Sequence, residues 1–519
     1  MVSVSTVNSQ ASLKHIMKTE REMLQAMERI SSGSRINNAG DDAAGAAISD
    51  RMLATVRALD MSIRNASDVL SMAQVAESAI NEHSQALQRI RELSIQAATD
   101  ILNAEQRIYL QTEADQLLQE MDRVARDTTF NEIAVLDGTF ADRRFQIGTH
   151  EREKAVISVA NMRIDKIGAF QSSTSMDEAG TAGNLASEGV VGANKAGAAS
   201  RVTTNDDLTI TGLVGQATVG LSGGESAKRI VELVNNKFDN TGVSATATTT
   251  IKIEVNSSDA AGDHVVGFNL YGKNTDAQAI SATIAVGSTV GTSDLSNLRD
   301  AINAYSANTG IRATLSADKT NIIIVQDEGE DVIIEDVNFA TVTNANTKFT
   351  FTALSQDQLD EAATQITTVV DTNSNANSDT VRFTGQITFH SSQTFTVSAT
   401  AGQGLFEAAP GTATLNKVST IDIRTVAGAV DALKVIDRAL DRVHMERAKF
   451  GAIMSRMNVV IDNLTNVSTN QKTSRSRIVD ANFAAESARL AKSQILQQSG
   501  MNMISQASRT MQNVLILFQ

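Results

Sequence analysis

The chain has 519 residues, a net charge of −14, no Cys, no Trp and only 4% aromatic residues. Its length allows three or four domains, its acidic balance argues against a general nucleic-acid binder, and the absence of Cys excludes disulfides and thiolate metal sites. Because enzyme cores usually carry more aromatic bulk, the composition favours coiled-coil or thin β packing.

The ends of the chain carry no pattern of a targeting or membrane segment. "MVSVSTVNSQ" at 1–10 has neither a basic patch nor an apolar run, so we expect no cleaved signal peptide. The apolar stretch "NVLILF" at 513–518 is too short to span a bilayer, so no membrane insertion is expected. The single proline in the chain, Pro410, suits very long helices.

Residues 4–32 carry apolar side chains at helical spacing. Ile16, Met23 and Ile30 recur every seven residues, as do Met17 and Leu24, and Leu13 and Met27 have the same spacing with Glu20 between them. This pattern predicts a helix with an apolar seam wider than that of a strict coiled coil. Gly33 follows as its stop.

"SSGSRINNAGDDAAGAAIS" at 31–49 joins this helix to the next with almost no bulky side chains. Asp41 and Asp42 are both candidate caps for the second helix. The small residues around Gly45 allow another backbone to come close, which indicates an assembly joint. The competing interpretation is an ordinary linker between helices.

Long helical patterns continue on both sides of a β-rich centre. We expect a helix that begins after Asp42 and is free of Gly and Pro over 46–100, helices over 104–127, 422–470 and 478–518, and a short hairpin after the "LDG" turn at 136–138. Between about 176 and 410 the sequence is rich in Thr, Ser, Asn and Gly, with strand patterns in "TTIKIEV", "NIIIVQ", "DVIIEDV" and "QTFTVSAT". The stretches 176–200 and 402–411 have the small residues of linkers.

A near-repeat lies within the centre. "AKRIVELVNNKFDNTGVSAT" at 227–246 matches "NLRDAINAYSANTGIRAT" at 297–314, and each reads as a helix, an Asn-Thr-Gly stop and a strand. Gly242 and Gly310 supply the left-handed stops. The expected class is therefore α+β and multidomain, with long N- and C-terminal helices that pair as coiled-coil-like bundles around a β-rich central outer region.

No motif of catalysis or cofactor binding stands out. The six His have no metal-ligand spacing, "HEREK" at 150–154 is not a zinc-protease motif, and "GLSGGESAKR" at 220–229 lacks the ending of a phosphate loop. We therefore expect a protein that is not an enzyme and has no cofactor, no metal site and no catalytic residues.

Several motifs at both ends resemble those of bacterial flagellins. They are "MERISSGSRINNAGDDAAGAAISDRM", "ALQRIRELSIQAA", "RSRIVDANFAAESARLAKSQILQQSGMNMISQA" and "QNVLILF". The resemblance covers about 1–170 and 412–519. The sequence departs from the family where Glu132 replaces a frequent Gly and Met511 a frequent Pro.

The resemblance implies the division into domains. Residues 1–42 with 474–519 would form the filament core, 43–175 with 412–473 a helical outer tube with a small β-hairpin, and 176–411 the surface-exposed β-rich outer domains, expected to number two. It also implies a structural subunit of the extracellular flagellar filament, exported through the flagellar type III channel without a cleaved signal. The implied partners are copies of itself, an export chaperone, the filament cap, hook–filament junction proteins and a flagellin-sensing Toll-like receptor.

Two groups of residues are implied as contact sites. We expect the subunit interface to contain Ile16, Met23, Ile30, Arg35, Asp41, Asp42, Gly45, Arg51, Arg477, Phe483, Leu490, Ile495, Leu496, Val514 and Leu515. The patch that resembles the receptor site comprises Leu87, Gln88, Arg89, Leu93, Gln96 and Glu113. The competing interpretation of that patch is that Leu87 and Leu93 simply pack in the core.

Two other functions stay open from the sequence. One is a hook–filament junction protein, which shares both terminal signatures. The other is a filament subunit whose outer domains also act as an adhesin.

Overall fold

The computed structural model describes residues 2–173, 190–192, 194–196, 198, 200, 202, 207–257, 262–286, 293–316, 318–339, 347–354, 367–371, 380–399 and 412–517. Contacts divide the chain into two compact units. One contains Met1–Val75, Ala141–Ser158 and Lys449–Gln519, and the other contains Ala76–Phe140 and Val159–Ala448. The expected α+β class is confirmed, since long helices occupy both ends of the sequence and strands its centre. Among the described residues, no helix combines the length and the apolar character needed to cross a membrane.

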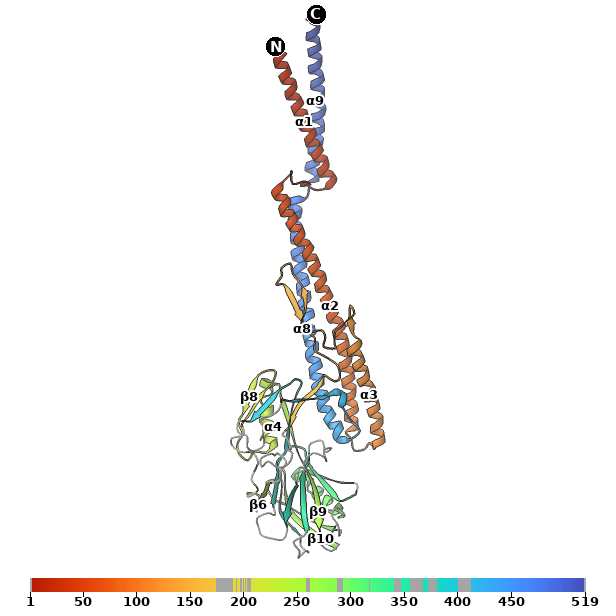
Figure 1. Ribbon diagram of the computed structural model, residues 1–519, viewed down its shortest axis with the longest axis vertical. Helices are drawn as coiled ribbons and strands as arrows, with labels where there is room; N and C mark the ends of the chain where they lie inside the picture. Colours follow the sequence, from red (N-terminus) through yellow and green to blue (C-terminus); the bar gives the residue numbers. More distant parts are fainter. Residues whose placement is uncertain are drawn as a thin grey trace. The chain divides into compact units, whose positions relative to one another are not determined.

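The first unit is built on the two ends of the chain. Helices α1 (Val2–Ser32) and α9 (Phe483–Leu517) lie side by side (Figure 1). The unit also holds the first part of α2 (Ala43–Ala97) and the last part of α8 (Val426–Val479), where Ser468 donates a hydrogen bond to Asp60 at 2.9 Å. The predicted hairpin is present as β3 (Arg143–Gln146) and β4 (Lys154–Ile157).

The predicted ends of the C-terminal helices are wrong. One helix, α8, begins later than expected because the Thr425 hydroxyl caps it, accepting from the Gly428 amide at 3.0 Å. It then continues through 471–477, where no Gly or Pro interrupts the pattern. The break comes only at 480–482, after which the Asn482 side chain caps α9 by accepting from the Ala485 amide at 3.2 Å.

The helical part of the second unit packs α2, α3 (Ala104–Asp127) and α8 together. Asn103 and Gln106 form a complete capping box at the start of α3. Within this unit, ion pairs connect α2 with α8 from Arg91 to Asp437 at 2.7 Å and from Arg447 to Glu77 at 3.1 Å. A short hairpin, β1 (Thr129–Phe130) and β2 (Ile133–Ala134), follows α3.

The strands of the centre form three antiparallel sheets within the described residues. The first has the order β11-β10-β14-β17-β6, with β11 (Gln278–Val286), β10 (Gly262–Tyr271), β14 (Val332–Phe339), β17 (Thr380–Phe383) and β6 (Val190–Gly192). The second has the order β12-β13-β9-β18-β5-β20, with β12 (Ile311–Leu315), β13 (Asn321–Gln326), β9 (Ser244–Ser257), β18 (Gln386–Ser391), β5 (Gly168–Ser173) and β20 (Thr414–Lys417). Two more strands branch from β9 in this sheet: β15 (Thr347–Ala353) pairs with β9, and β16 (Thr367–Asp371) pairs with β15. The third is β19-β7-β8, with β19 (Thr396–Ala399), β7 (Leu208–Thr211) and β8 (Gln216–Val219).

All four predicted strand patterns fall on strands. The cores of the centre are formed by two apolar clusters, of which one contains Phe349, Phe351 and Phe383 and the other contains Ile230 and Phe389. Strands β5 and β20, which flank the predicted outer region, pair with each other, and β5 also pairs with the central strand β18. A single turn of 3₁₀ helix (Val418–Thr420) leads from β20 toward α8. The predicted linkers at 176–200 and 402–411 lie mostly outside the described residues.

The near-repeat is one structural module used twice. Each copy is a hairpin, a helix, a helical turn and a strand: β7-β8-α4-α5-β9, with α4 (Ala227–Asn235) and α5 (Phe238–Thr241), and β10-β11-α6-α7-β12, with α6 (Ser296–Ala304) and α7 (Ser306–Thr309). Gly242 and Gly310 close the turns at φ +70° and +71°, as predicted. In both copies an Asn at the same position, Asn235 or Asn303, accepts from a strand amide at 2.8 Å.

Candidate subunit interface

The inner face of the α1–α9 pair follows a heptad pattern. Buried or half-buried side chains recur at 16, 19, 23, 26 and 30 on α1 and at 486, 490, 493, 497, 500 and 504 on α9. A Cβ built on Gly500 would lie 2.9 Å from Ile16 Cγ1, so the Ile16 side chain fills the space beside this glycine. Four predicted interface residues, Ile16, Met23, Ile30 and Leu490, therefore belong to faces that the chain already pairs within itself. Their contact with other subunits stays a prediction.

A second apolar stripe on α1 is exposed. Leu13, Met17, Leu24 and Met27 are 45%, 57%, 57% and 49% exposed, although all four are large apolar side chains. Their spacing puts them on one face of the helix, about 100° around from the inner face. We call these four residues the α1 stripe. The sequence contains the signal of this stripe, because all four side chains belong to the wide apolar seam predicted for residues 4–32.

Apolar side chains are also exposed on α9. The expected interface residues Phe483, Ile495 and Leu496 are 57%, 65% and 44% exposed, and Met501 and Met503 are exposed as well. The side chains of Val514 and Leu515 lie outside the described residues. At 100° per residue, Phe483 and Met501 lie on one face of α9, Leu496 and Met503 on another and Ile495 on a third.

Arg35 attaches the joint to the end of α8. Its guanidinium donates to the Ile478 carbonyl through Nη2 at 2.6 Å and Nε at 3.2 Å, and its amide donates to the Val479 carbonyl at 2.6 Å. The Ala481 amide returns a hydrogen bond to the Gly33 carbonyl at 2.9 Å. Segments that are more than 440 residues apart in the sequence are thus held together by backbone groups.

The two candidate cap residues of the joint have different roles. Asp42 caps α2, since its Oδ1 accepts from the Gly45 amide at 2.9 Å. Asp41 instead holds the loop, accepting from the Asn37 and Asn38 amides at 3.1 Å and from Gln25 at 2.8 Å. The hydrogen bonds from Gln25, Asn37 and Asn38 hold the pKa of the Asp41 carboxyl below its usual value.

Gly45 is small for a reason within the chain. It is buried, and a Cβ on it would lie 2.5 Å from Asp42 Oδ2 and 2.8 Å from Ile36 Cδ1. A side chain here would therefore displace the ends of the Asp42 and Ile36 side chains, whatever another subunit contributes. The remaining two charged residues of the expected interface, Arg51 and Arg477, are exposed.

The receptor-like patch separates into two kinds of residue. Leu87 and Leu93 are 0% and 1% exposed, so both side chains pack in the core of the chain. The polar members, Gln88, Arg89, Gln96 and Glu113, are all exposed on α2 and α3. Arg89 pairs with Glu113 at 2.8 Å and with Glu92 at 2.9 Å.

Comparison with known proteins agrees with this arrangement. The family model of the bacterial flagellin N-terminal helical region matches residues 4–141, and that of the C-terminal helical region matches 433–518. The B-type flagellin of Pseudomonas aeruginosa is 33% identical over 521 residues, which cover 100% of this chain and 99% of that protein. This chain belongs to the bacterial flagellin family.

Other relatives extend the comparison. A flagellin of Salmonella choleraesuis is 29% identical over 537 residues, covering 100% of both chains. The solved structure of FliC from Burkholderia pseudomallei is similar over 75% of this flagellin and 99% of that chain, with 18% identity and a TM-score of 0.28. At this identity and TM-score the solved structure adds nothing to the family assignment, which rests on the sequence relatives.

Family membership gives the function. This flagellin is a structural subunit of the filament that bacteria use for swimming, and its relatives form that filament outside the cell. The junction-protein and adhesin alternatives are not favoured, because relatives that match the whole length are flagellins.

Proposed function

We propose that the α1 stripe, together with the exposed apolar residues of α9, is the surface through which this flagellin contacts neighbouring subunits in the filament. The observation that supports this is the two-faced character of α1. One heptad face already has its partner in α9, whereas the α1 stripe has about half of each side chain in solvent. A polymer supplies the cover that a single chain lacks.

The free energy that each apolar side chain contributes to assembly is small, so a stable polymer requires many contacts at once. A fully desolvated Leu or Met side chain contributes roughly 1.5–3 kcal/mol, so half-exposed ones contribute about half of that on assembly. Immobilising a side chain on assembly costs up to about 2 kcal/mol of rotamer freedom for Met and about 0.5–1 kcal/mol for Leu. Neither helix can therefore bind a neighbour through one or two side chains, and assembly is cooperative. Exposed charges such as Arg51 and Arg477 set the alignment between subunits more than the affinity.

We assign the domains as the family resemblance implies. Residues 1–42 with 474–519 are proposed as the filament core, 43–175 with 412–473 as the outer tube and 176–411 as the surface region. The separate α1–α9 pair supports the first assignment, although its boundary at 473/474 falls inside α8. The two apolar cores of the centre support two outer domains.

The partners are proposed at the same level. They are an export chaperone, the filament cap, hook–filament junction proteins and, for the free subunit, a flagellin-sensing Toll-like receptor. The exposed group of Gln88, Arg89, Gln96 and Glu113 supports the receptor assignment. Export without a cleaved signal peptide and a purely structural, non-enzymatic role complete the proposal.

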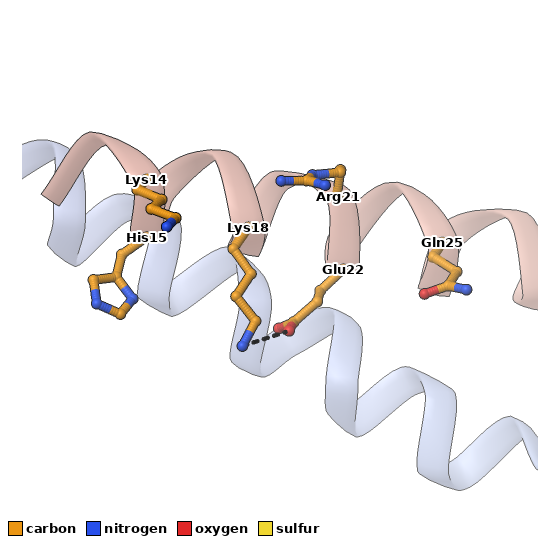
Figure 2. Close-up of a pocket in the computed structure, with 6 residues that line it drawn as sticks. All are labelled: Lys14, His15, Lys18, Arg21, Glu22 and Gln25. Atoms are coloured by element: carbon orange, nitrogen blue, oxygen red, sulfur yellow. Dashed lines mark ion pairs between the residues drawn. The ribbon is translucent and has the colours of Figure 1, made fainter. Parts of the chain in front are cut away.

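The test compares two faces of α1. Met17→Ser with Leu24→Ser removes apolar area from the α1 stripe, and Lys14→Ser with Lys18→Ser changes the polar face shown in Figure 2. We expect the stripe variant to raise the critical concentration for polymerisation at least about tenfold, which corresponds to about 1.4 kcal/mol per subunit. The lysine variant is expected to polymerise as the unchanged protein does.

Sedimentation of polymer and electron microscopy provide the readout, with circular dichroism of the free subunit as the folding control. An unchanged critical concentration for the stripe variant would refute the proposed interface. It would leave the family assignment intact, because that rests on the whole sequence.

A further inference from the structure

A buried carboxylate lies in the seam between α1 and α9. The Glu486 side chain is 6% exposed and sits in the first turn of α9, where the helix dipole favours a negative charge. It pairs with Arg29 Nη1 at 3.4 Å and with Arg489 Nη1 at 3.0 Å. Because Arg489 is on the same helix and moves with Glu486, it is Arg29 that ties this carboxylate to α1.

Arg29 also reaches the joint. Its Nη2 lies 3.8 Å from Asp41 Oδ1, and both side chains are at most 16% exposed. One guanidinium thus connects α1, α9 and the loop that continues into α2. A slide of α1 along α9 by one helical turn, about 5.4 Å, would leave Glu486 without its partner on α1. Arg489 would stay beside Glu486, so the slide costs the charge-assisted contact with Arg29 and not the whole pairing of the carboxylate.

The rest of the seam discriminates poorly between registers. Three of the six inner-face positions of α9 are Ser493, Gln497 and Gly500, which offer little apolar area to fix a position. The close approach of Ile16 to Gly500 is the other fixed point. Arg29 and Ile16 are thirteen residues apart on α1, and Glu486 and Gly500 are fourteen residues apart on α9, which runs in the opposite direction. Both contacts therefore fit one antiparallel register.

We propose that the Arg29–Glu486 pair sets the register of α1 on α9 and thereby fixes the position of the α1 stripe along the helix axis relative to the exposed apolar residues of α9. This inference rests on the proposed interface, because the register matters for assembly only if both helices contribute to one contact surface. Arg29 and Glu486 are positioning residues: they act through the alignment of the stripe rather than by touching the neighbouring subunit. A buried polar contact that selects one alignment of paired helices is a known use of such groups.

The experiment reads the register directly by cross-linking. The chain has no Cys, so an introduced pair reports without background. The register above places Met23 opposite Ser493, and a pair with Met23→Cys and Ser493→Cys is expected to close a disulfide. The shifted pair, Met23→Cys with Gln497→Cys, is one helical turn away and is expected to stay open.

Each of the two cysteine pairs is then introduced into a chain that also carries Arg29→Met and Glu486→Met, which we call the double-Met background. Replacing both charges with apolar groups avoids an unpaired buried charge, so a merely structural role predicts unchanged cross-linking. The cysteine variants are copolymerised at low proportion with the unchanged protein. The disulfides are scored by mass spectrometry after the polymer is dissolved without reductant, because mass separates links within a chain from links between chains.

We expect the double-Met background to lose in-register cross-linking and gain the shifted one, and to polymerise poorly by itself. Arg29→Lys, which keeps the charge, should retain the in-register product. In-register cross-linking that persists at full yield in the double-Met background would overturn the inference. That outcome is independent of the stripe test, which is scored by critical concentration and leaves the ion pair unchanged.

Discussion

Substituting Gly45 in the joint gives a sharp test of why this region is built from small residues. Gly45 is the third residue of α2, and its amide donates to the Asp42 cap at 2.9 Å. A methyl group at this position meets Asp42 Oδ2 at 2.5 Å and Ile36 Cδ1 at 2.8 Å. Gly45→Ala therefore forces both the Asp42 cap and the Ile36 side chain to move, or the helix start to shift.

The magnitude follows from three terms. Loss of an N-cap costs about 0.5–2 kcal/mol, and forcing a methyl into a packed site costs about 1–3 kcal/mol. Alanine regains at most about 1 kcal/mol over glycine in a helix. The net expectation is that Gly45→Ala destabilises the joint by roughly 1–3 kcal/mol, and that Gly45→Leu exceeds this and impairs filament formation.

Gly40→Ala is the matched control. Gly40 lies in the same loop, its φ is not in the left-handed region, and a Cβ there meets nothing within 4 Å. Hydrogen exchange of peptides spanning 33–50 should accelerate roughly ten- to hundredfold in Gly45→Ala and little in Gly40→Ala. Equal exchange in the two variants, or normal helical filaments from Gly45→Leu, would refute the reasoning.

Three further predictions concern other parts of the chain. Glu132 is exposed at φ +64°, next to Asn131 at φ +49°, in the β1–β2 turn. Because glycine adopts positive φ without strain, Glu132→Gly should stabilise the protein against urea by about 0.5–1 kcal/mol. Glu151 is exposed and has no positive φ, so Glu151→Gly should not stabilise it. Asn103→Ala removes the capping box of α3 and should cost about 1 kcal/mol, which would appear as faster hydrogen exchange in the first turn of α3; unchanged exchange would contradict the assigned cap. Burial, with the nearby Lys434 and Arg438, lowers the pKa of His390 from 6.5 to about 3. The unfolded chain therefore binds a proton at this histidine more readily than the folded chain. The free energy of unfolding should fall by up to about 1.4 kcal/mol per pH unit from pH 6.5 down to about 3. His390→Gln should lose this slope, and His150→Gln, at an exposed position, should keep it.

Some features of the candidate interface could be predicted from the sequence because their causes are local. The seven-residue spacing on α1 marks an apolar face whatever covers it, and the cap of α2 depends on Asp42 and an amide three residues away. Gly242 and Gly310 end their helical turns through backbone conformation alone. The family signature likewise resides in the order of residues, so membership and function followed from it.

Other features depended on where distant segments meet. The covered and the exposed apolar side chains of α1 both follow seven-residue spacings. Only the position of α9, more than 450 residues away, decides that Ile16 is covered and Leu24 exposed. The same meeting puts Arg35 on the end of α8 and Arg29 beside Glu486. The sequence by itself determined which side chains could pack, because periodicity and capping act over a few residues. The tertiary structure alone decided which of them do pack within one chain, because burial is set by the partner that a face receives.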